Sequence, residues 1–232
     1  DWASTFGKAN YASYKSVALG IGNNANGNQS VAVGYSNNAT ATDTTALGRA
    51  TTASATAATA VGRDSKATGD YALAVGYLNN ANTNATAVGY DNDATALRTT
   101  ALGYSNNAIG DYSAALGYNN DTASNNSTAV GSSNEATGSQ STALGYTNQA
   151  TATATTAVGY DNDATGEKAT AVGYQNTANT YSTAVGYNNT ASANNATALG
   201  RSNTASSTSA TAVGYSNEAT ATQGTAVGYN NK

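Results

Sequence analysis

The 232-residue sequence contains no cysteine, methionine, histidine or proline, and only one tryptophan and one phenylalanine. Without histidine and cysteine, the commonest general base and the thiol nucleophile are both missing. The thirteen acidic residues are scattered without a recurring facing pair, and the abundant serines have no partner that could activate them. The composition therefore predicts that the protein is not an enzyme, has no catalytic residue and uses no cofactor.

Charge and long apolar runs are also scarce. Charged residues make up 9% of the sequence, and nine basic against thirteen acidic side chains give a net charge of −4. The scattered basic residues form no face for phosphates, so nucleic acid is not expected as a partner. No apolar run approaches the roughly 18 residues of a membrane span, and no signal peptide opens the chain. We therefore expect no membrane contact by this segment.

What the sequence does contain is a 14-residue repeat. An Ala-Val-Gly or Ala-Leu-Gly triplet ends at sixteen glycines, which are fourteen residues apart except for two steps of thirteen, ending at Gly89 and Gly186. With this glycine at position seven, position five is always Ala and position six is always Val or Leu. Position ten is Asn in fourteen copies, with Thr51 and Ser65 as exceptions, and position twelve is Ala except at Thr122. Such self-similarity indicates a repeat architecture.

The unit is too short for a helix pair, which takes about 33 residues or more. Thr-Ala-Val-Gly alternates as a strand does, and the Gly-Tyr-x-Asn that follows is typical of a turn. Two strands and two turns would close one coil, and stacked coils would form parallel ladders, with the Asn amides bonded from coil to coil. The sequence predicts an all-β solenoid of about 17 coils, counting a degenerate N-terminal copy.

The chain is expected to be a single repeat domain over residues 1–232. Residues 16–232 carry the regular repeats, and residues 1–15 form the degenerate copy, which holds Trp2 and Phe6. End coils of a solenoid expose a face that inner coils bury. We therefore interpret residues 1–15 as a capping coil.

The alternation within each strand predicts a partner chain. Position six points to one side of the strand, and positions five and seven point to the other. We expect Val or Leu at position six to fill the interior of the coil. Positions five and seven then form the outer face, and only a close neighbour explains why that face is restricted to Ala and Gly. The strand would be buried on both sides, once in its own coil and once against another chain.

Three segments carry a family resemblance: Ser-Val-Ala-Leu-Gly (16–20), Gln-Ser-Val-Ala-Val-Gly (29–34) and Ala-Thr-Gly-Asp-Tyr-Ala (67–72). The repeat resembles the head repeat of trimeric autotransporter adhesins of the YadA type, over essentially the whole chain. The resemblance implies a left-handed parallel β-roll, a homotrimer, and display outside the cell, on a bacterial outer surface. The same module occurs in phage tail fibres. No neck, heptad stalk or C-terminal membrane barrel is recognised in this segment.

Position eight, directly after the glycine, is the candidate binding surface. A stripe of Tyr with occasional Arg has the composition favoured at interfaces. The alternative is that Tyr covers the turn and shields ladder hydrogen bonds. The candidate residues are Tyr35, Arg49, Arg63, Tyr77, Tyr90, Tyr104, Tyr118, Tyr146, Tyr160, Tyr174, Tyr187, Arg201, Tyr215 and Tyr229.

Two identical turns raise the question of a metal site. Asp91 and Asp93 flank an Asn in one, and Asp161 and Asp163 do so in the other. Paired carboxylates suit Ca²⁺, but no further acid completes a ligand shell, so we predict no metal.

Three functions remain open. The leading hypothesis is a trimeric surface adhesin head that attaches to host matrix, cells or surfaces, with itself and an unknown surface ligand as its partners. The alternatives are a phage tail-fibre shaft and an ice-binding Thr-rich solenoid. Thr-x-Thr tracts do not recur every fourteen residues, which argues against the last.

Overall fold

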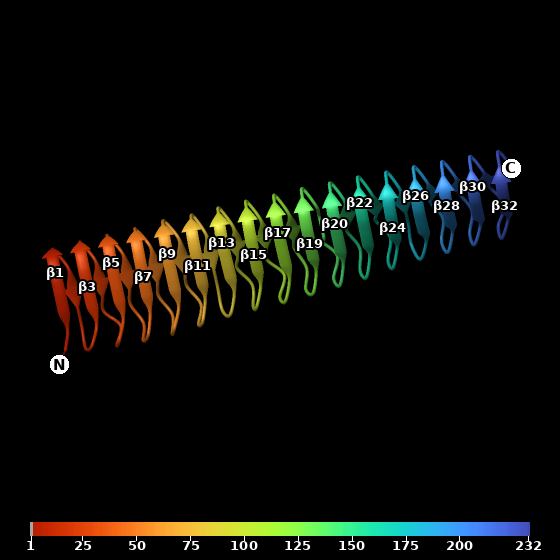
Figure 1. Cartoon of the computed structure of the whole chain (residues 1–232). Coiled ribbons are helices and arrows are strands. Elements are labelled where there is room, and N and C mark those ends of the chain that lie inside the picture. Colours follow the sequence, from red (N-terminus) through yellow and green to blue (C-terminus); the bar gives the residue numbers. More distant parts are fainter. Residues whose placement is uncertain (1) are drawn as a thin grey trace. The chain divides into compact units, whose positions relative to one another are not determined.

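The computed structural model describes residues 2–232 and places them in two compact units, Asp1–Gly117 and Tyr118–Lys232. Within each unit the chain forms successive coils. Every regular coil contains a five-residue strand, and most return through a two-residue strand. The five-residue strands of one unit all run parallel and appear as aligned arrows in Figure 1. This is the all-β parallel solenoid that the sequence predicts, and the described residues contain no helix.

The first unit contains five-residue strands β1 (Ser4–Lys8), β3 (Val17–Ile21), β5 (Val31–Tyr35), β7 (Thr45–Arg49), β9 (Thr59–Arg63), β11 (Leu73–Tyr77), β13 (Thr86–Tyr90) and β15 (Thr100–Tyr104), and the boundary falls within β17 (Ala114–Tyr118). Its two-residue strands are β2 (Tyr11–Ala12), β4 (Asn24–Ala25), β6 (Asn38–Ala39), β8 (Thr52–Ala53), β10 (Lys66–Ala67), β12 (Asn80–Ala81), β14 (Asp93–Ala94) and β16 (Asn107–Ala108).

The second unit contains five-residue strands β19 (Thr128–Ser132), β20 (Thr142–Tyr146), β22 (Thr156–Tyr160), β24 (Thr170–Tyr174), β26 (Thr183–Tyr187), β28 (Thr197–Arg201), β30 (Thr211–Tyr215) and β32 (Thr225–Tyr229). Its two-residue strands are β18 (Asp121–Thr122), β21 (Gln149–Ala150), β23 (Asp163–Ala164), β25 (Thr177–Ala178), β27 (Thr190–Ala191), β29 (Thr204–Ala205) and β31 (Glu218–Ala219). Between β18 and β21, Glu135 continues the ladder as an isolated bridge.

Stacking is in register throughout each unit, so like residues lie over like. In the β20–β22 pair, for example, Ala143 lies beside Ala157, and Gly145 beside Gly159. The two steps of thirteen residues leave this register unchanged, since Gly89 still pairs with Gly76 and Gly186 with Gly173. The missing residue is therefore absorbed in a turn, and the strands keep their alignment.

A ladder of buried asparagines at position ten runs inside the coils, as the sequence predicts. Asn148 donates its amide to Asn134 Oδ1 at 3.0 Å, to Leu144 O at 2.9 Å and to Gly159 O at 2.8 Å. Its Oδ1 accepts from the backbone and side chain of Asn162 at 3.1 and 2.9 Å. Each Asn therefore bonds to its own coil and to both neighbours. Asparagines are the largest fully buried side chains in the described chain.

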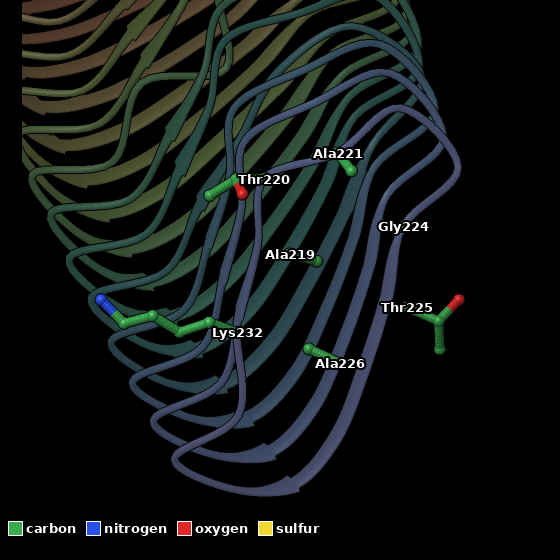
Figure 2. A pocket seen from close by; sticks show the side chains of 7 residues that line it. All are labelled: Ala219, Thr220, Ala221, Gly224, Thr225, Ala226 and Lys232. Atoms are coloured by element: carbon green, nitrogen blue, oxygen red, sulfur yellow. The ribbon is translucent and has the colours of Figure 1, made fainter.

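The orientation of the five-residue strand is the reverse of the sequence expectation. Position five faces the coil interior, and Ala143, Ala157 and their equivalents are fully buried. Position six lies on the outer face, where Leu144 and Val158 are only partly buried. Figure 2 shows the same arrangement in the last coil, where Ala219 and Ala226 point inward and Thr225 points out. The interior of a coil this narrow holds Ala, Ser and Thr but no larger aliphatic side chain.

A different cause also underlies the invariant glycine at position seven. Gly145 has φ +121°, a conformation that side-chain-bearing L residues rarely adopt. A Cβ on Gly145 would also lie 2.0 Å from the carbonyl oxygen of Gly159 in the next coil. The restriction to glycine thus comes from the neighbouring coil of the same chain, so it is not evidence for a second chain.

Both turns of each coil use left-handed backbone. Position nine has φ between 49° and 57° wherever it is not glycine, and position two has φ between 54° and 60°. Most residues there are Asn, Asp, Ser, Gln or Ala, and Thr147 is the only β-branched one. A residue other than glycine pays roughly 1–2 kcal/mol for left-handed backbone. The contacts between stacked coils must therefore stabilise these turns.

The degenerate N-terminal copy forms a true coil. β1 pairs in register with β3, placing Phe6 beside Leu19, and β2 pairs with β4. Trp2 and Phe6 are 84% and 77% exposed in the single chain. Residue 1 lies outside the described residues, and the capping role of residues 1–15 stays a prediction.

Candidate binding surface

The candidate Tyr and Arg residues end the five-residue strands, directly after the glycine. Those of the first unit end strands β5, β7, β9, β11, β13 and β15, and those from Tyr118 onward belong to the second unit. Most of these side chains are exposed, with Tyr174 at 37% and Tyr229 at 72% marking the range among the exposed tyrosines. Arg49, Arg63 and Arg201 are exposed as well, which agrees with the expectation that position eight reaches solvent.

In the first unit these side chains stack in a column. Tyr77 and Tyr90 have ring centroids 5.0 Å apart, and Tyr90 and Tyr104 are 4.8 Å apart with rings parallel to within 4°. The guanidinium of Arg63 lies 5.2 Å from the Tyr77 ring and is paired with the adjacent Asp64 carboxylate at 3.1 Å. The column is therefore held by ring stacking and by cation–π contacts.

The second unit repeats the arrangement over a longer run. Successive centroid distances from Tyr146 through Tyr160 and Tyr174 to Tyr187 are 5.1, 4.8 and 5.0 Å. Arg201 then lies 5.3 Å from Tyr187 and 5.3 Å from Tyr215, between the two rings. We call this set, with its counterpart in the first unit, the Tyr/Arg column.

Stacking decides what the column can offer to a ligand. Where neighbours are in contact, each ring face is covered by the next ring, so only edges and hydroxyl groups face outward. Ile21 and Ser132 stand at position eight in place of Tyr or Arg, so they interrupt the regular pattern of the column.

A second outer surface is formed by positions four and six of the same strands. Val or Leu at six is partly buried in most coils and reaches 60% exposure at Val227, and position four is mostly Thr. This Val/Leu stripe recurs in every regular coil of each unit. Extended rows of exposed apolar side chains are typical of interaction sites.

A column at the opposite turn was missed from the sequence. At position two, Arg98 lies 5.6 Å from the Tyr112 ring, and Lys168 lies 5.2 Å from the Tyr181 ring. The sequence signal was weak because position two varies from coil to coil, and aromatic residues occupy it only in some copies.

The Asp pairs considered for a metal lie at positions nine and eleven. Burial raises the pKa of Asp163, and the nearby Asp161 carboxylate raises it further. Among residues 2–232, no three acidic side chains gather as a metal site would need. The same part of the chain contains no helix long and apolar enough to cross a membrane.

A hollow lies at the last coil of the chain. Ala219, Ala221, Gly224 and Ala226 line it, with Lys232 at its edge (Figure 2). It is the open end of the coil interior, with small apolar side chains and no converging polar groups.

Parallel coils with an asparagine ladder inside and regular columns outside define a repetitive parallel β-solenoid. The family model of the YadA head domain repeat matches residues 14–37, 39–65, 53–79, 81–106, 108–134, 136–162, 164–180, 179–203 and 205–231. The chain therefore belongs to the YadA head domain repeat family, as its repeat motifs indicated. No curated protein matches the sequence.

Membership in this family defines the general function of the chain. The family is a structural adhesin repeat rather than an enzyme family, and its members are trimeric. The chain is thus a segment of the trimeric autotransporter adhesin type, and heads of this type are exposed on bacterial surfaces.

Proposed function

We propose that this segment is a homotrimeric adhesin head that attaches a bacterial cell to host matrix, other cells or surfaces. The observation that carries the proposal is the Val/Leu stripe. Each coil keeps Ala, Ser, Thr and the ladder Asn inside and places its largest aliphatic residue on an outer face. Burying one such residue against a partner is worth about 1.5–3 kcal/mol, and the stripe repeats this contact coil after coil.

The stripe supports a trimer contact on a different face from the one inferred from the sequence. Leu144→Asp should disrupt the trimer, because a carboxylate would be desolvated at the contact. The control is Asn194→Asp, which places the same charge on an exposed turn residue without an acidic neighbour at the same place in the adjacent coils. Light scattering after size exclusion should give about 69 kDa for the parent and control, three times 23.0 kDa. A stable folded parent monomer would overturn the homotrimer.

The Tyr/Arg column is the surface that we assign to attachment. Many weak repeated contacts would act through avidity, so attachment should fall in steps as Tyr160→Ala and Tyr174→Ala are combined. Tyr181→Ala, in the opposite turn, is the matched control and should leave attachment unchanged. Adhesion of cells or beads displaying the chain measures this, and unchanged attachment in the double variant, with an unaltered melting temperature, would refute the assignment.

Ice binding is a second candidate, favoured by one observation. Thr at position four and Val or Leu at position six lie in register on one outer face, so the Thr residues form a regular row even though Thr-x-Thr tracts do not recur. The trimer contact would cover the same face, so the two functions exclude each other. Thermal hysteresis of the purified protein tests this candidate directly.

A further inference from the structure

Tyrosine is the side chain of the second unit that an oxidant attacks most readily. The sequence contains no Cys or Met, which are the usual first targets of oxidants, and no His. Its single Trp is Trp2, which belongs to the first unit. One-electron oxidation of the second unit is therefore directed to its tyrosines.

Four of these tyrosines form an unbroken stack within the Tyr/Arg column. The strand register places Tyr146, Tyr160, Tyr174 and Tyr187 beside one another in successive coils. The centroids of Tyr160 and Tyr174 are 4.8 Å apart, and their rings are parallel to within 5°. The centroids of Tyr174 and Tyr187 are 5.0 Å apart, and their rings are parallel to within 4°. The backbone ladder thus holds neighbouring rings in contact before any reaction begins.

The stacked rings are also accessible to solvent. Tyr160 is 42% exposed, Tyr174 37% and Tyr187 45%. Because stacking covers the ring faces, the exposed part of each side chain is the ring edge with its hydroxyl group. A ring that loses an electron can therefore release its phenol proton to water.

We propose that this stack is a site of oxidative tyrosine coupling, which joins successive coils through a carbon–carbon bond between Tyr160 and Tyr174 or between Tyr174 and Tyr187. The oxidant is hydrogen peroxide acting through a haem peroxidase. The modification is a further property of the Tyr/Arg column and does not depend on the attachment function assigned to it.

The reaction balances as follows in atoms and electrons. Each of two neighbouring rings gives up one electron and its hydroxyl proton, and the peroxide takes up both electrons and both protons to become two molecules of water. The two tyrosyl radicals then form one bond between the ring carbons next to the hydroxyl-bearing carbons. These two carbons lose their protons while both oxygens regain one, so the chain has lost two hydrogen atoms in total.

The geometry limits which tyrosines couple. Rings that are already aligned react without the entropic cost of bringing them together. Arg201 lies between Tyr187 and Tyr215, 5.3 Å from each ring, and two coil steps separate these tyrosines by about 9.6 Å. Tyr181 lies in the opposite turn, beside Lys168. Coupling should therefore join consecutive members of the stack, and it should stop at Arg201.

The test treats the full chain at low concentration with horseradish peroxidase and hydrogen peroxide, then denatures it and digests it with trypsin. Cleavage after each Lys and Arg gives the peptides 99–168 and 169–201. A bond between Tyr160 and Tyr174 joins these two peptides, and mass spectrometry should find their summed mass less two hydrogens. Before digestion, the product should migrate as a single chain on a denaturing gel.

The break in the stack gives an internal control. A bond between Tyr187 and Tyr215 would join peptide 169–201 to peptide 202–232. We expect no such product, because Arg201 separates these two rings.

Two conservative variants complete the test. Tyr174→Phe removes the phenol from the stack and should lower the yield of the joined peptides at least about tenfold. Tyr181→Phe removes a phenol from the same peptide but outside the stack, and it should leave the yield unchanged. Equal yields in the two variants, cross-links between chains in place of coupling within one, or oxidised tyrosines without any joined peptide would each overturn the proposal.

Discussion

The side chain of Asn189 joins three successive coils, so its removal tests what holds the solenoid together. Its amide donates to Asn176 Oδ1 and Val185 O at 3.0 Å each and to Gly200 O at 2.8 Å. Its Oδ1 accepts from the backbone N–H and the side-chain amide of Asn203, both at 3.0 Å. The residue is fully buried, so water cannot replace these partners.

Asn189→Ala should therefore be strongly destabilising. The buried N–H of Asn203 loses its acceptor and the Gly200 carbonyl loses a donor, and each buried polar group without a partner costs about 1–3 kcal/mol. The volume left by the amide adds to this cost. We expect a loss of about 3–5 kcal/mol in the free energy of unfolding, per chain.

The control is Asn194→Ala, the same substitution at an exposed residue in the next turn, which should cost less than about 0.5 kcal/mol. Urea unfolding followed by circular dichroism measures both variants. Because coils interact mainly with their neighbours, hydrogen exchange should show the lost protection centred on β26 and β28. Equal stability of the two variants would refute the view that the asparagine ladder holds the coils.

Three further outcomes are expected. Thr147→Asn should raise the free energy of unfolding by about 1 kcal/mol, because a β-branched residue at φ 51° is replaced by one that tolerates left-handed backbone; an unchanged melting temperature would contradict this. Thr51→Asn combined with Ser65→Asn should complete the asparagine ladder and stabilise by roughly 1 kcal/mol per restored bond, measured by urea unfolding. The pKa of Asp163 is raised in the folded state by burial and by Asp161, so its ionisation disfavours folding. Asp163→Asn should then raise the free energy of unfolding at neutral pH, and this gain should vanish as the pH falls below 3.8, the ordinary pKa of an Asp side chain. A gain that grows on acidification would contradict the sign.

The sequence alone determined the architecture. A 14-residue period with alternating strand residues and turn residues is compatible with few folds other than a solenoid. The glycine at position seven of each repeat also predicted where each five-residue strand lies. The asparagine ladder was also predictable, because an amide both donates and accepts and can therefore bond to identical residues above and below. The composition of the Tyr/Arg column, and its accessible position after the glycine, were equally visible in the repeat.

Only the tertiary structure decided which way each strand faces. Alternation divides residues between two sides but does not say which side is inside, and the usual rule that large aliphatic residues fill the interior failed here. A coil closed by two short strands has room for Ala143 and for the asparagine ladder, so Leu144 must lie outside. The tertiary structure likewise decided that the rings of the Tyr/Arg column cover one another. Backbone hydrogen bonds set the distance between successive coils, and this distance matches the spacing of stacked rings.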